Sequence, residues 1–234
     1  MTHRTPLSSP ALAVAHTRRR PIGRALKAWA KMGLRHFPWR EERTPYSVLL
    51  AEMLLRRTTS KAAASVFQDF LRMFPDTEAL AKGDRGTLRS LLRKIGLQEQ
   101  RTRALTEMAQ YLLANHFGQI PSSRNELERV PHIGSYTAAA VRSFGFGIPD
   151  AVVDSNVMRI IRRLFAKSIR RRKLPTRDYE RLAQELLPKH HQIHNFSLLD
   201  LGALVCRYDY PRCPGCPLRN FCDTGRPRSP SRRS

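Results

Sequence analysis

The stretch of sequence that decides the fold runs from residue 123 to residue 135 and reads SRNELERVPHIGS. Ser123 and Glu126 have the spacing of a capping box, which predicts that a short helix begins at this point. Pro131 and Gly134 then interrupt the helical pattern before a second helix starts. A helix-hairpin-helix of this kind points backbone amides outward at one spot, which suits a DNA phosphate. An ordinary helical hairpin inside a bundle fits the same pattern.

Asp154 lies twenty residues after Gly134, behind an apolar run and directly before a predicted helix. The position is typical of a helix N-cap, and capping alone would explain the residue. Helix amides would also keep this carboxylate charged, because they favour the anion. A permanent carboxylate is what an oxocarbenium-like sugar requires when its base departs. The residues alone leave both interpretations open.

The periodicity of the rest of the chain is helical nearly throughout, without a convincing strand pattern. Thr44 and Pro45 have the pattern of a helix cap followed by a first-turn proline. Further helices are predicted over residues 62–73, 87–94, 101–115, 124–130, 136–146, 156–165 and 177–187. The sequence therefore predicts an all-α fold.

All four cysteines of the chain form one Cys-x6-Cys-x2-Cys-x5-Cys run, made by Cys206, Cys213, Cys216 and Cys222. Four thiolates this close in sequence can converge on one metal centre, either tetrahedral zinc or a [4Fe-4S] cluster. Zinc sites usually pair two Cys-x2-Cys knuckles, and this run has one, so its spacing favours the cluster. Disulfides would suit a secreted chain, but we see no apolar signal segment and expect reduced thiols.

The charge of the chain favours a polyanion as partner. Its 234 residues carry a formal net charge of +23, and duplex DNA is the commonest polyanion that neutralises such a surface. RNA and anionic membranes are the alternatives. The longest apolar run, residues 196–205, is interrupted by Asp200 and is too short to span a bilayer, so we expect no membrane partner. Residues 1–21 and 224–234 are basic, so we expect a disordered arm and a basic tail that touch DNA. An organelle transit peptide is the alternative for the arm.

Taken together, these motifs resemble the base-excision DNA glycosylases of the endonuclease III superfamily. The helix-hairpin-helix, the apolar-Asp-x-Asn run at Asp154 and the four-cysteine loop occur in that family's order. The runs FPWR at 37–40 and LAEMLL at 50–55 look like the branch that contains adenine and mismatch-thymine glycosylases. The resemblance covers residues 37–222. It implies a six-helix barrel over residues 43–149 and an iron-sulfur cluster domain over residues 22–42 and 150–223.

The resemblance also implies three catalytic residues and a [4Fe-4S] cluster as cofactor. Asp154 would stabilise the sugar cation and help water to attack C1'. Glu52 lies in an apolar helix, from which it would hydrogen-bond to or protonate the departing base. Tyr136 stands where bifunctional relatives carry a lysine nucleophile. A tyrosine forms no Schiff base, so the resemblance implies hydrolysis without strand scission.

DNA contacts follow from the same resemblance, around a nucleotide that is rotated out of the duplex. Leu97 would be the wedge, and Arg57 would fill the vacated space beside the orphaned guanine. The residues expected to meet the DNA backbone are His132, Ile133, Gly134 and Ser135 in the hairpin, and Arg207 and Arg212 in the cysteine loop. His132 replaces a glycine of the family pattern, so its side chain must tolerate the backbone angle that glycine allowed.

The expected substrate is double-stranded DNA with thymine or uracil opposite guanine. Residues 56–59 read RRTT, as in the thymine branch, whereas adenine glycosylases typically carry a glutamine pair here. The extra C-terminal domain with which many adenine glycosylases recognise oxidised guanine is also missing. The alternatives are an adenine glycosylase acting opposite guanine or 8-oxoguanine, and a non-catalytic DNA-binding relative.

Three histidines, His190, His191 and His194, have no acid or cysteine beside them and are expected to lie on the surface. We expect the chain to be a monomer. If its source is prokaryotic, we expect it to be cytoplasmic and associated with the nucleoid.

Overall fold

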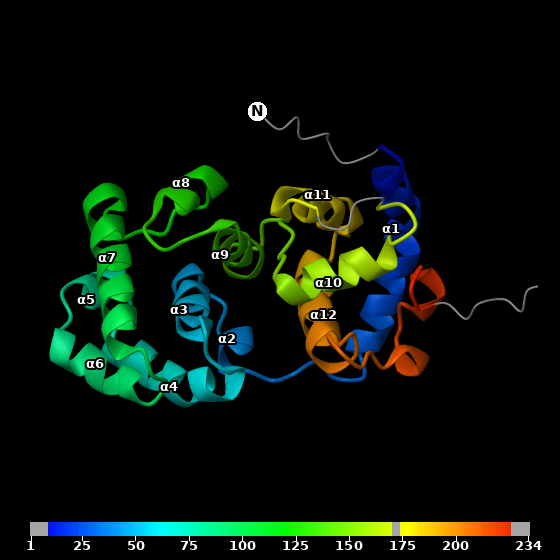
Figure 1. Cartoon of the computed structure of the whole chain (residues 1–234). Helices are drawn as coiled ribbons and strands as arrows, with labels where there is room; N and C mark the ends of the chain where they lie inside the picture. Colours follow the sequence, from blue (N-terminus) through cyan, green and yellow to red (C-terminus); the bar gives the residue numbers. More distant parts are fainter. Residues whose placement is uncertain (1–8, 170–173, 226–234) are drawn as a thin grey trace, which may run out of the picture. The chain divides into compact units, whose positions relative to one another are not determined.

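The computed structural model describes residues 9–169 and 174–225, and every regular element within those ranges is a helix (Figure 1). The predicted all-α fold is confirmed. The chain divides into two compact units, which we call the contiguous unit, residues 36–148, and the two-segment unit, formed by the described residues on either side of it. None of the described helices is long and apolar enough to cross a bilayer.

The contiguous unit begins at α2 and ends at a short π-helix. Its elements are α2 (Pro38–Glu41), α3 (Pro45–Leu55), α4 (Ser60–Met73), α5 (Thr77–Ala81), α6 (Arg85–Arg93), α7 (Gln98–His116), α8 (Arg124–Arg129), α9 (Ser135–Ala140) and η1 (Val141–Gly145). Helices α5 and α6 pack against α7, and α3 packs against α4, α9 and η1. α3 is therefore the central helix of this unit, buried from Ser47 to Leu54.

The start of α3 is fixed by the predicted cap. The Thr44 hydroxyl accepts a hydrogen bond from the Ser47 backbone N–H at 3.0 Å, and the Ser47 hydroxyl accepts one from the Thr44 N–H at 2.9 Å. Pro45 follows at the first helical position. At α8, by contrast, the Ser123 side chain makes no capping hydrogen bond, so the capping box predicted there is wrong. The helix nevertheless begins at Arg124.

The boundary between the two units differs from the predicted one. The sequence placed residues 36–42 with the iron-sulfur domain, whereas the structure places them in the contiguous unit. Trp39 explains the difference, because its ring stacks on Phe37 and meets Phe67 of α4 edge-on, with ring centroids 5.6 Å apart. Trp39 is only 9% exposed.

The two-segment unit brings the N-terminal helix against the C-terminal third of the chain. Its elements are α1 (Ser9–Ala30), α10 (Ser155–Leu164), α11 (Thr176–Leu186), α12 (His191–Leu204), and the 3-10 turns η2 (Cys213–Gly215) and η3 (Arg219–Phe221). Helix α1 packs against α11 and α12, and α10 packs against both of them as well. The core of this unit therefore depends on α1.

The prediction of a disordered arm over residues 1–21 is wrong for residues 9–21, which form the first half of α1. Ala11 and Ala15 are fully buried there, and Ile22 and Leu26 continue the same core further along the helix. The basic residues of α1 lie between these apolar positions, so this stretch combines a buried stripe with a cationic surface. Residues 1–8 and 226–234, where the rest of the arm and most of the tail lie, are outside the described residues.

Candidate functional site

Three of the predicted DNA-contact residues line one pocket of the contiguous unit. Arg57 comes from the turn after α3, Leu97 from the turn before α7 and His132 from the hairpin, and the pocket they share has a volume of about 360 Å³. All three residues are exposed. Segments of sequence 35 to 75 residues apart are thus gathered at one place, as a site for a single ligand requires.

The same three residues have a left-handed backbone. The φ angles are 51° at Arg57, 55° at Leu97 and 66° at His132, and Phe117 is the one other non-glycine residue with positive φ among the described residues. A left-handed residue with a Cβ costs about 1 kcal/mol or more, and such strain concentrates at functional sites. His132 therefore adopts the glycine-like angle that its position in the hairpin demands, at a cost to the folded state.

Arg101, which the sequence analysis missed, holds two of these turns in place. Its guanidinium donates to the carbonyl groups of Gly96 at 2.9 Å, Leu54 at 3.0 Å and Arg56 at 2.5 Å. Arg101 is only 7% exposed, and burial lowers its pKa from the ordinary arginine value, followed by the charge of Arg56. An arginine remains charged even so. Its side chain connects the end of α3 to the turn before α7, which fixes the positions of the two strained residues.

The hairpin is joined to α7 by a carboxylate. Glu107 of α7 contacts the His132 ring, with Nε2 and Oε2 2.6 Å apart, and accepts a hydrogen bond from Arg103 at 2.7 Å. These contacts lower the pKa of Glu107, with the Arg103 hydrogen bond as the larger cause and that from His132 next. The carboxylate therefore stays ionised and orients the imidazole at the rim of the pocket.

The remaining hairpin residues differ in exposure, and Ile133, which was predicted to meet the DNA backbone, has its side chain buried. Ile133 is buried and anchors the turn, while Gly134 is exposed and precedes α9. A Cβ on Gly134 would meet no atom within 4 Å, so the packing of the chain itself does not require glycine there. Ser135 and Tyr136 are half-buried in the first turn of α9. The missing side chain at Gly134 leaves the backbone of this turn open to an approaching ligand.

Glu52 lies on the central helix α3 between Ala51 and Met53, all of them buried, and is itself 9% exposed. This environment matches the apolar surroundings predicted for it. The side chain of Glu52 is therefore largely shielded from solvent.

Asp154 is the N-cap of α10, as predicted, and both of its carboxylate oxygens are held. Oδ1 accepts a hydrogen bond from the Val157 N–H at 2.7 Å, and Oδ2 accepts one from the Asn156 amide at 2.7 Å. The Asn156 oxygen in turn accepts from Arg159 at 2.8 Å. Gly202 of α12 permits this arrangement, because a Cβ there would lie 2.6 Å from the Asn156 Cβ. The Asp154 carboxylate is thus held in one orientation at a helix N-terminus.

The four cysteines are all free and half-buried, so the structure contains no disulfide among the described residues. Burial raises the pKa of the Cys216 thiol, and the charges of Cys206, Cys222 and Cys213 raise it further, which places all four sulfurs in one neighbourhood. Within the described ranges, no group of three or more histidines, cysteines or acids is arranged to hold a metal ion as it stands. The donor set fits a four-thiolate centre in its chemistry, although the side chains do not form a closed ligand cage.

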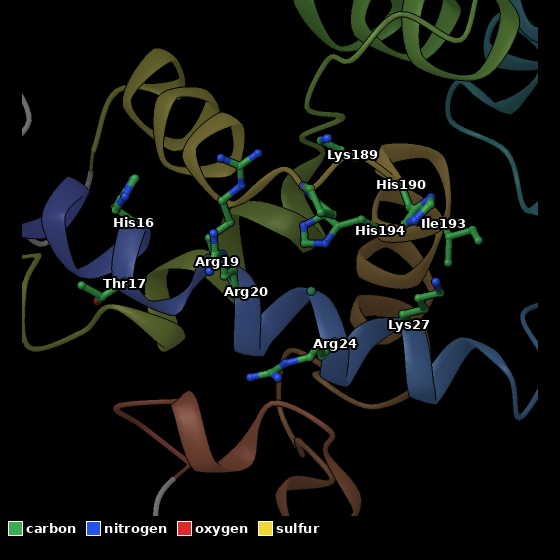
Figure 2. A pocket seen from close by; sticks show the side chains of 12 residues that line it. His16, Thr17, Arg19, Arg20, Arg24, Lys27, Lys189, His190, Ile193 and His194 are labelled. Carbon is green, nitrogen blue, oxygen red and sulfur yellow. The ribbon is translucent and has the colours of Figure 1, made fainter.

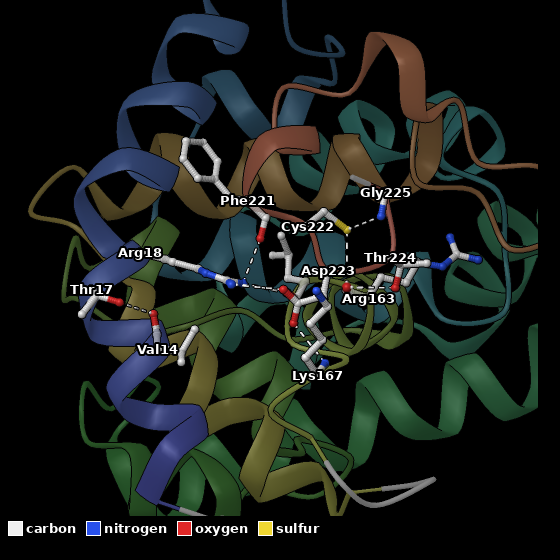
Figure 3. A network of polar contacts seen from close by, with 11 residues as sticks. Val14, Thr17, Arg18, Arg163, Lys167, Phe221, Cys222, Asp223, Thr224 and Gly225 are labelled. Atoms are coloured by element: carbon white, nitrogen blue, oxygen red, sulfur yellow. Dashed lines mark hydrogen bonds and ion pairs between the residues drawn. The ribbon is translucent and has the colours of Figure 1, made fainter. Parts of the chain in front are cut away.

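Two N–H donors point at these sulfurs. Arg163 of α10 donates to the Cys206 Sγ at 3.3 Å, and the Gly225 backbone N–H donates to the Cys222 Sγ at 3.3 Å. Donors of this kind stabilise negative charge on thiolates. Figure 3 shows how the end of the loop is held, with the Asp223 carboxylate accepting from Arg18 of α1 at 3.1 Å. The cysteine loop is therefore fastened to both α10 and α1.

The two arginines predicted to meet DNA in this loop are exposed, as such a role requires. Arg207 and Arg212 lie between Cys206 and Cys213. The Arg207 carbonyl accepts from Arg163 at 2.6 Å, which fixes the backbone while the side chain remains available. Neither residue has a side-chain ion pair among the described residues.

The prediction for the histidine group is wrong in two of three cases. His190 is exposed, but His191 is 8% and His194 only 3% exposed. Both lie in the first turn of α12, whose surface is buried nearly all round. Hydropathy patterns place histidine outside by default, whereas here α1 covers the helix.

Comparison with known proteins gives a consistent result. A model of the HhH-GPD superfamily base excision DNA repair proteins matches residues 50–189. The thymine-DNA glycosylase of Aeropyrum pernix is 32% identical over 206 residues, which are 86% of this chain and 92% of that protein. The thymine/uracil-DNA glycosylase of Pyrobaculum aerophilum is 32% identical over 83% of this chain and 86% of its own. Adenine DNA glycosylase of Mycobacterium tuberculosis is also 32% identical, but this chain covers 64% of it.

Solved structures agree. A thermostable thymine-DNA glycosylase superimposes with a TM-score of 0.82 at 29% identity, over 91% of this chain and 97% of that one. An endonuclease III in a trapped covalent complex with DNA gives a TM-score of 0.71 at 26% identity, over 88% and 96% of the two chains.

Proposed function

Because this chain belongs to the HhH-GPD superfamily of base excision DNA repair proteins, we propose that it is a DNA glycosylase that removes thymine or uracil opposite guanine. The observation that carries the proposal is the Asp154 carboxylate, which two hydrogen bonds hold in one orientation after an apolar run. A fixed anion is what a sugar needs as positive charge develops on it. The ligand is double-stranded DNA.

Each chemical role is given to one residue. The target nucleotide is rotated out of the duplex, because its glycosidic bond is unreachable in the stack. Leu97 wedges into the duplex and Arg57 contacts the orphaned guanine. Glu52 protonates or hydrogen-bonds to the departing base. This stabilises the negative charge that develops on the base as the glycosidic bond breaks. Asp154 stabilises the oxocarbenium-like sugar and orients the water that attacks C1'.

The choice of base rests on residues 56–59 and on the relatives. Arg56 and Arg57 stand where adenine glycosylases typically carry two glutamines, and the relatives from Aeropyrum and Pyrobaculum are named for thymine and uracil. A T:G or U:G mismatch is also cheaper to open than a normal pair, which helps selection. The second candidate is an adenine glycosylase, favoured by the Mycobacterium relative at the same identity.

A panel of duplexes tests the choice. We expect single-turnover excision from T:G and U:G pairs to exceed that from A:G and A:8-oxoguanine pairs. Faster excision of adenine opposite 8-oxoguanine would establish the second candidate. A protein that binds all four duplexes and excises nothing would be the non-catalytic relative.

Asp154→Asn tests the catalytic assignment. Asparagine keeps the shape and the cap but removes the charge, so DNA binding should persist while excision falls by about a hundredfold or more. Asp84→Asn is the matched control, because Asp84 caps α6 by accepting from the Thr87 N–H at 2.7 Å, far along the chain from the proposed chemistry. Equal excision by the two variants would reject the role of Asp154.

We propose that the reaction ends at an abasic site. Tyr136 occupies the position of the lysine nucleophile, and a phenol forms no iminium with C1'. Product strands should stay intact until they are treated with alkali, and borohydride should trap little protein on DNA. Efficient trapping that is lost on replacing a lysine would show that another amine has taken over.

We propose that Cys206, Cys213, Cys216 and Cys222 hold a [4Fe-4S] cluster. When bound, the cluster supplies structural cross-linking of the loop that carries Arg207 and Arg212. The free thiols and the N–H donors at Cys206 and Cys222 support this donor set. Purified protein should be brown, with a broad absorption near about 400 nm. Colourless, active protein with one equivalent of zinc would contradict the proposal.

A further inference from the structure

A second pocket, with a volume of about 900 Å³, lies in the two-segment unit between α1 and the beginning of α12 (Figure 2). Five cations line it, Arg19, Arg20, Arg24, Lys27 and Lys189, and its lining contains no aspartate or glutamate. None of the five forms an ion pair with any residue that the structure describes. Like charges around a hollow repel one another unless an anion joins them.

His194 distinguishes this pocket from an ordinary solvated basic surface. Its ring lines the pocket, is 3% exposed, and has no hydrogen-bond partner at Nδ1 or Nε2 within the described chain. A buried polar group without a partner costs about 1–3 kcal/mol, so native structures seldom keep one without use. Figure 2 shows the ring among the basic side chains, on the side of α12 that faces α1. An atom entering the pocket can supply the missing partner.

The spacing of the cations indicates the length of the ligand. Arg20, Arg24 and Lys27 follow one another at i, i+4 and i+7, so they form a stripe along one face of α1 that is about 10 Å long. Lys189 contributes a further charge from the segment before α12. A single phosphate cannot reach both ends of such a stripe, whereas two or three linked phosphates can.

We propose that this pocket binds a small ligand with a di- or triphosphate group, such as inorganic triphosphate or a nucleoside triphosphate. The linked phosphates lie along Arg20, Arg24 and Lys27, and a terminal phosphate oxygen reaches the His194 ring. A duplex backbone fits less well, because each of its phosphates is flanked by sugars and reaches a 3%-exposed imidazole poorly. The inference does not depend on the proposed glycosylase activity.

Calorimetric titration of the purified protein with inorganic triphosphate, at about 0.15 M salt, tests the pocket. We expect one saturable site in the wild-type protein. The double variant Arg20→Gln/Arg24→Gln should weaken binding at least about tenfold. Its matched control is Arg177→Gln/Arg181→Gln, which removes two exposed arginines at the same i, i+4 spacing from α11 in the same unit, outside the pocket. The control should stay within about twofold of wild type.

Further titrations distinguish a nucleotide from an inorganic phosphate chain as the ligand. ATP binding more tightly than triphosphate indicates a nucleotide, and equal affinity indicates that only the phosphates are recognised. NMR of the wild-type protein should show the His194 ring signals shifting on titration, which keeps the test valid if a variant does not fold. The proposal is overturned by the absence of saturable binding, by equal weakening in both double variants, or by unmoved His194 signals. Stoichiometric displacement of triphosphate by an undamaged duplex would assign the pocket to DNA instead.

Discussion

Arg101 in the first pocket and the cations around His194 in the second pocket differ in their partners. In the contiguous unit, Arg101 is 7% exposed and its donors are taken by carbonyl groups of the turns around the pocket. In the two-segment unit, the cations around His194 have no acidic partner among the described residues. A buried cation that donates to backbone carbonyl groups holds the fold in shape, whereas cations left around a hollow remain available to a ligand. Residue type alone does not distinguish a cation that stabilises the fold from one that can bind a ligand. The hydrogen-bond and ion-pair partners of its side chain do.

The backbones around the two pockets also differ. Three left-handed residues surround the first pocket, and regular helices form most of the second. Strain at the first pocket presents side chains outward to a large partner. The second pocket is preformed by helix packing, and its ligand has to enter it.

Arg101→Ala should have the largest effect on stability, and it tests whether Arg101 has the structural role that the comparison assigns to it. Its removal leaves the carbonyl groups of Leu54, Arg56 and Gly96 without a buried donor, so the free energy of unfolding should fall by about 3 kcal/mol or more. Urea denaturation measures the change. Arg103→Ala, two residues along the same helix, removes an exposed arginine paired with Glu107 and should change the midpoint little. Equal midpoints for the two variants would mean that Arg101 does not organise these turns.

The pH dependence of stability tests the second pocket, through the titration of His194. Burial, and then the charge of Arg19, lower the pKa of His194 to about 4, from an ordinary value of 6.5. Lys189 and His190 also face this pocket, and no acid lines it. As the pH falls, His194 is therefore protonated in the unfolded chain at a higher pH than in the folded protein. Stability is complete above pH 6.5 and is lost as the pH falls toward 4, by about 3 kcal/mol over the window.

Urea unfolding between pH 4.5 and 7.5 measures this loss. His194→Gln should flatten the slope in that range, because glutamine does not titrate. His36→Gln, at an exposed histidine, should leave the slope unchanged. The interpretation fails if His194→Gln and wild type lose stability in parallel as the pH falls.

The smallest effect is expected from relieving strain at the first pocket. Leu97 and Phe117 are the left-handed residues at the two ends of α7, and both are exposed apolar side chains. Glycine adopts this conformation freely, so Leu97→Gly and Phe117→Gly should each raise the free energy of unfolding by about 1 kcal/mol. Only Leu97→Gly should lower the excision rate, because it removes the proposed wedge. A loss of excision in both variants would assign the effect to α7 rather than to Leu97.

The sequence predicted those parts of the molecule whose signals are local. Thr44 and Asp154 were placed correctly as caps from the residues that follow them, although the same local signal was wrong at Ser123. The helix-hairpin-helix followed from the proline and glycine that interrupt it. For His132 the sequence predicted only that the side chain must tolerate the backbone angle of a family glycine, and the structure shows that this angle is left-handed.

What the sequence did not predict depends on distant partners. Arg101 bonds to carbonyl groups about 45 residues earlier in the chain, and no pattern around it indicates them. The first half of helix α1 was taken for a disordered arm because its apolar stripe is interrupted by consecutive arginines, and the stripe has meaning only against α11 and α12. His194 was placed on the surface for the same reason.

Arg18 joins the first described helix to the segment that follows the cysteine loop. Its guanidinium donates to the Phe221 carbonyl at 2.9 Å and to Asp223 at 3.1 Å, across a separation of more than two hundred residues (Figure 3). On the ribosome the contiguous unit can complete its contacts as soon as residue 148 has emerged. Helix α1 precedes that unit in the chain, so its apolar stripe stays uncovered until α11 and α12, which end at Leu204, have emerged. Newly made chains therefore pass through a stage with one folded unit and one exposed helix, at which a nascent-chain chaperone or a protease would act.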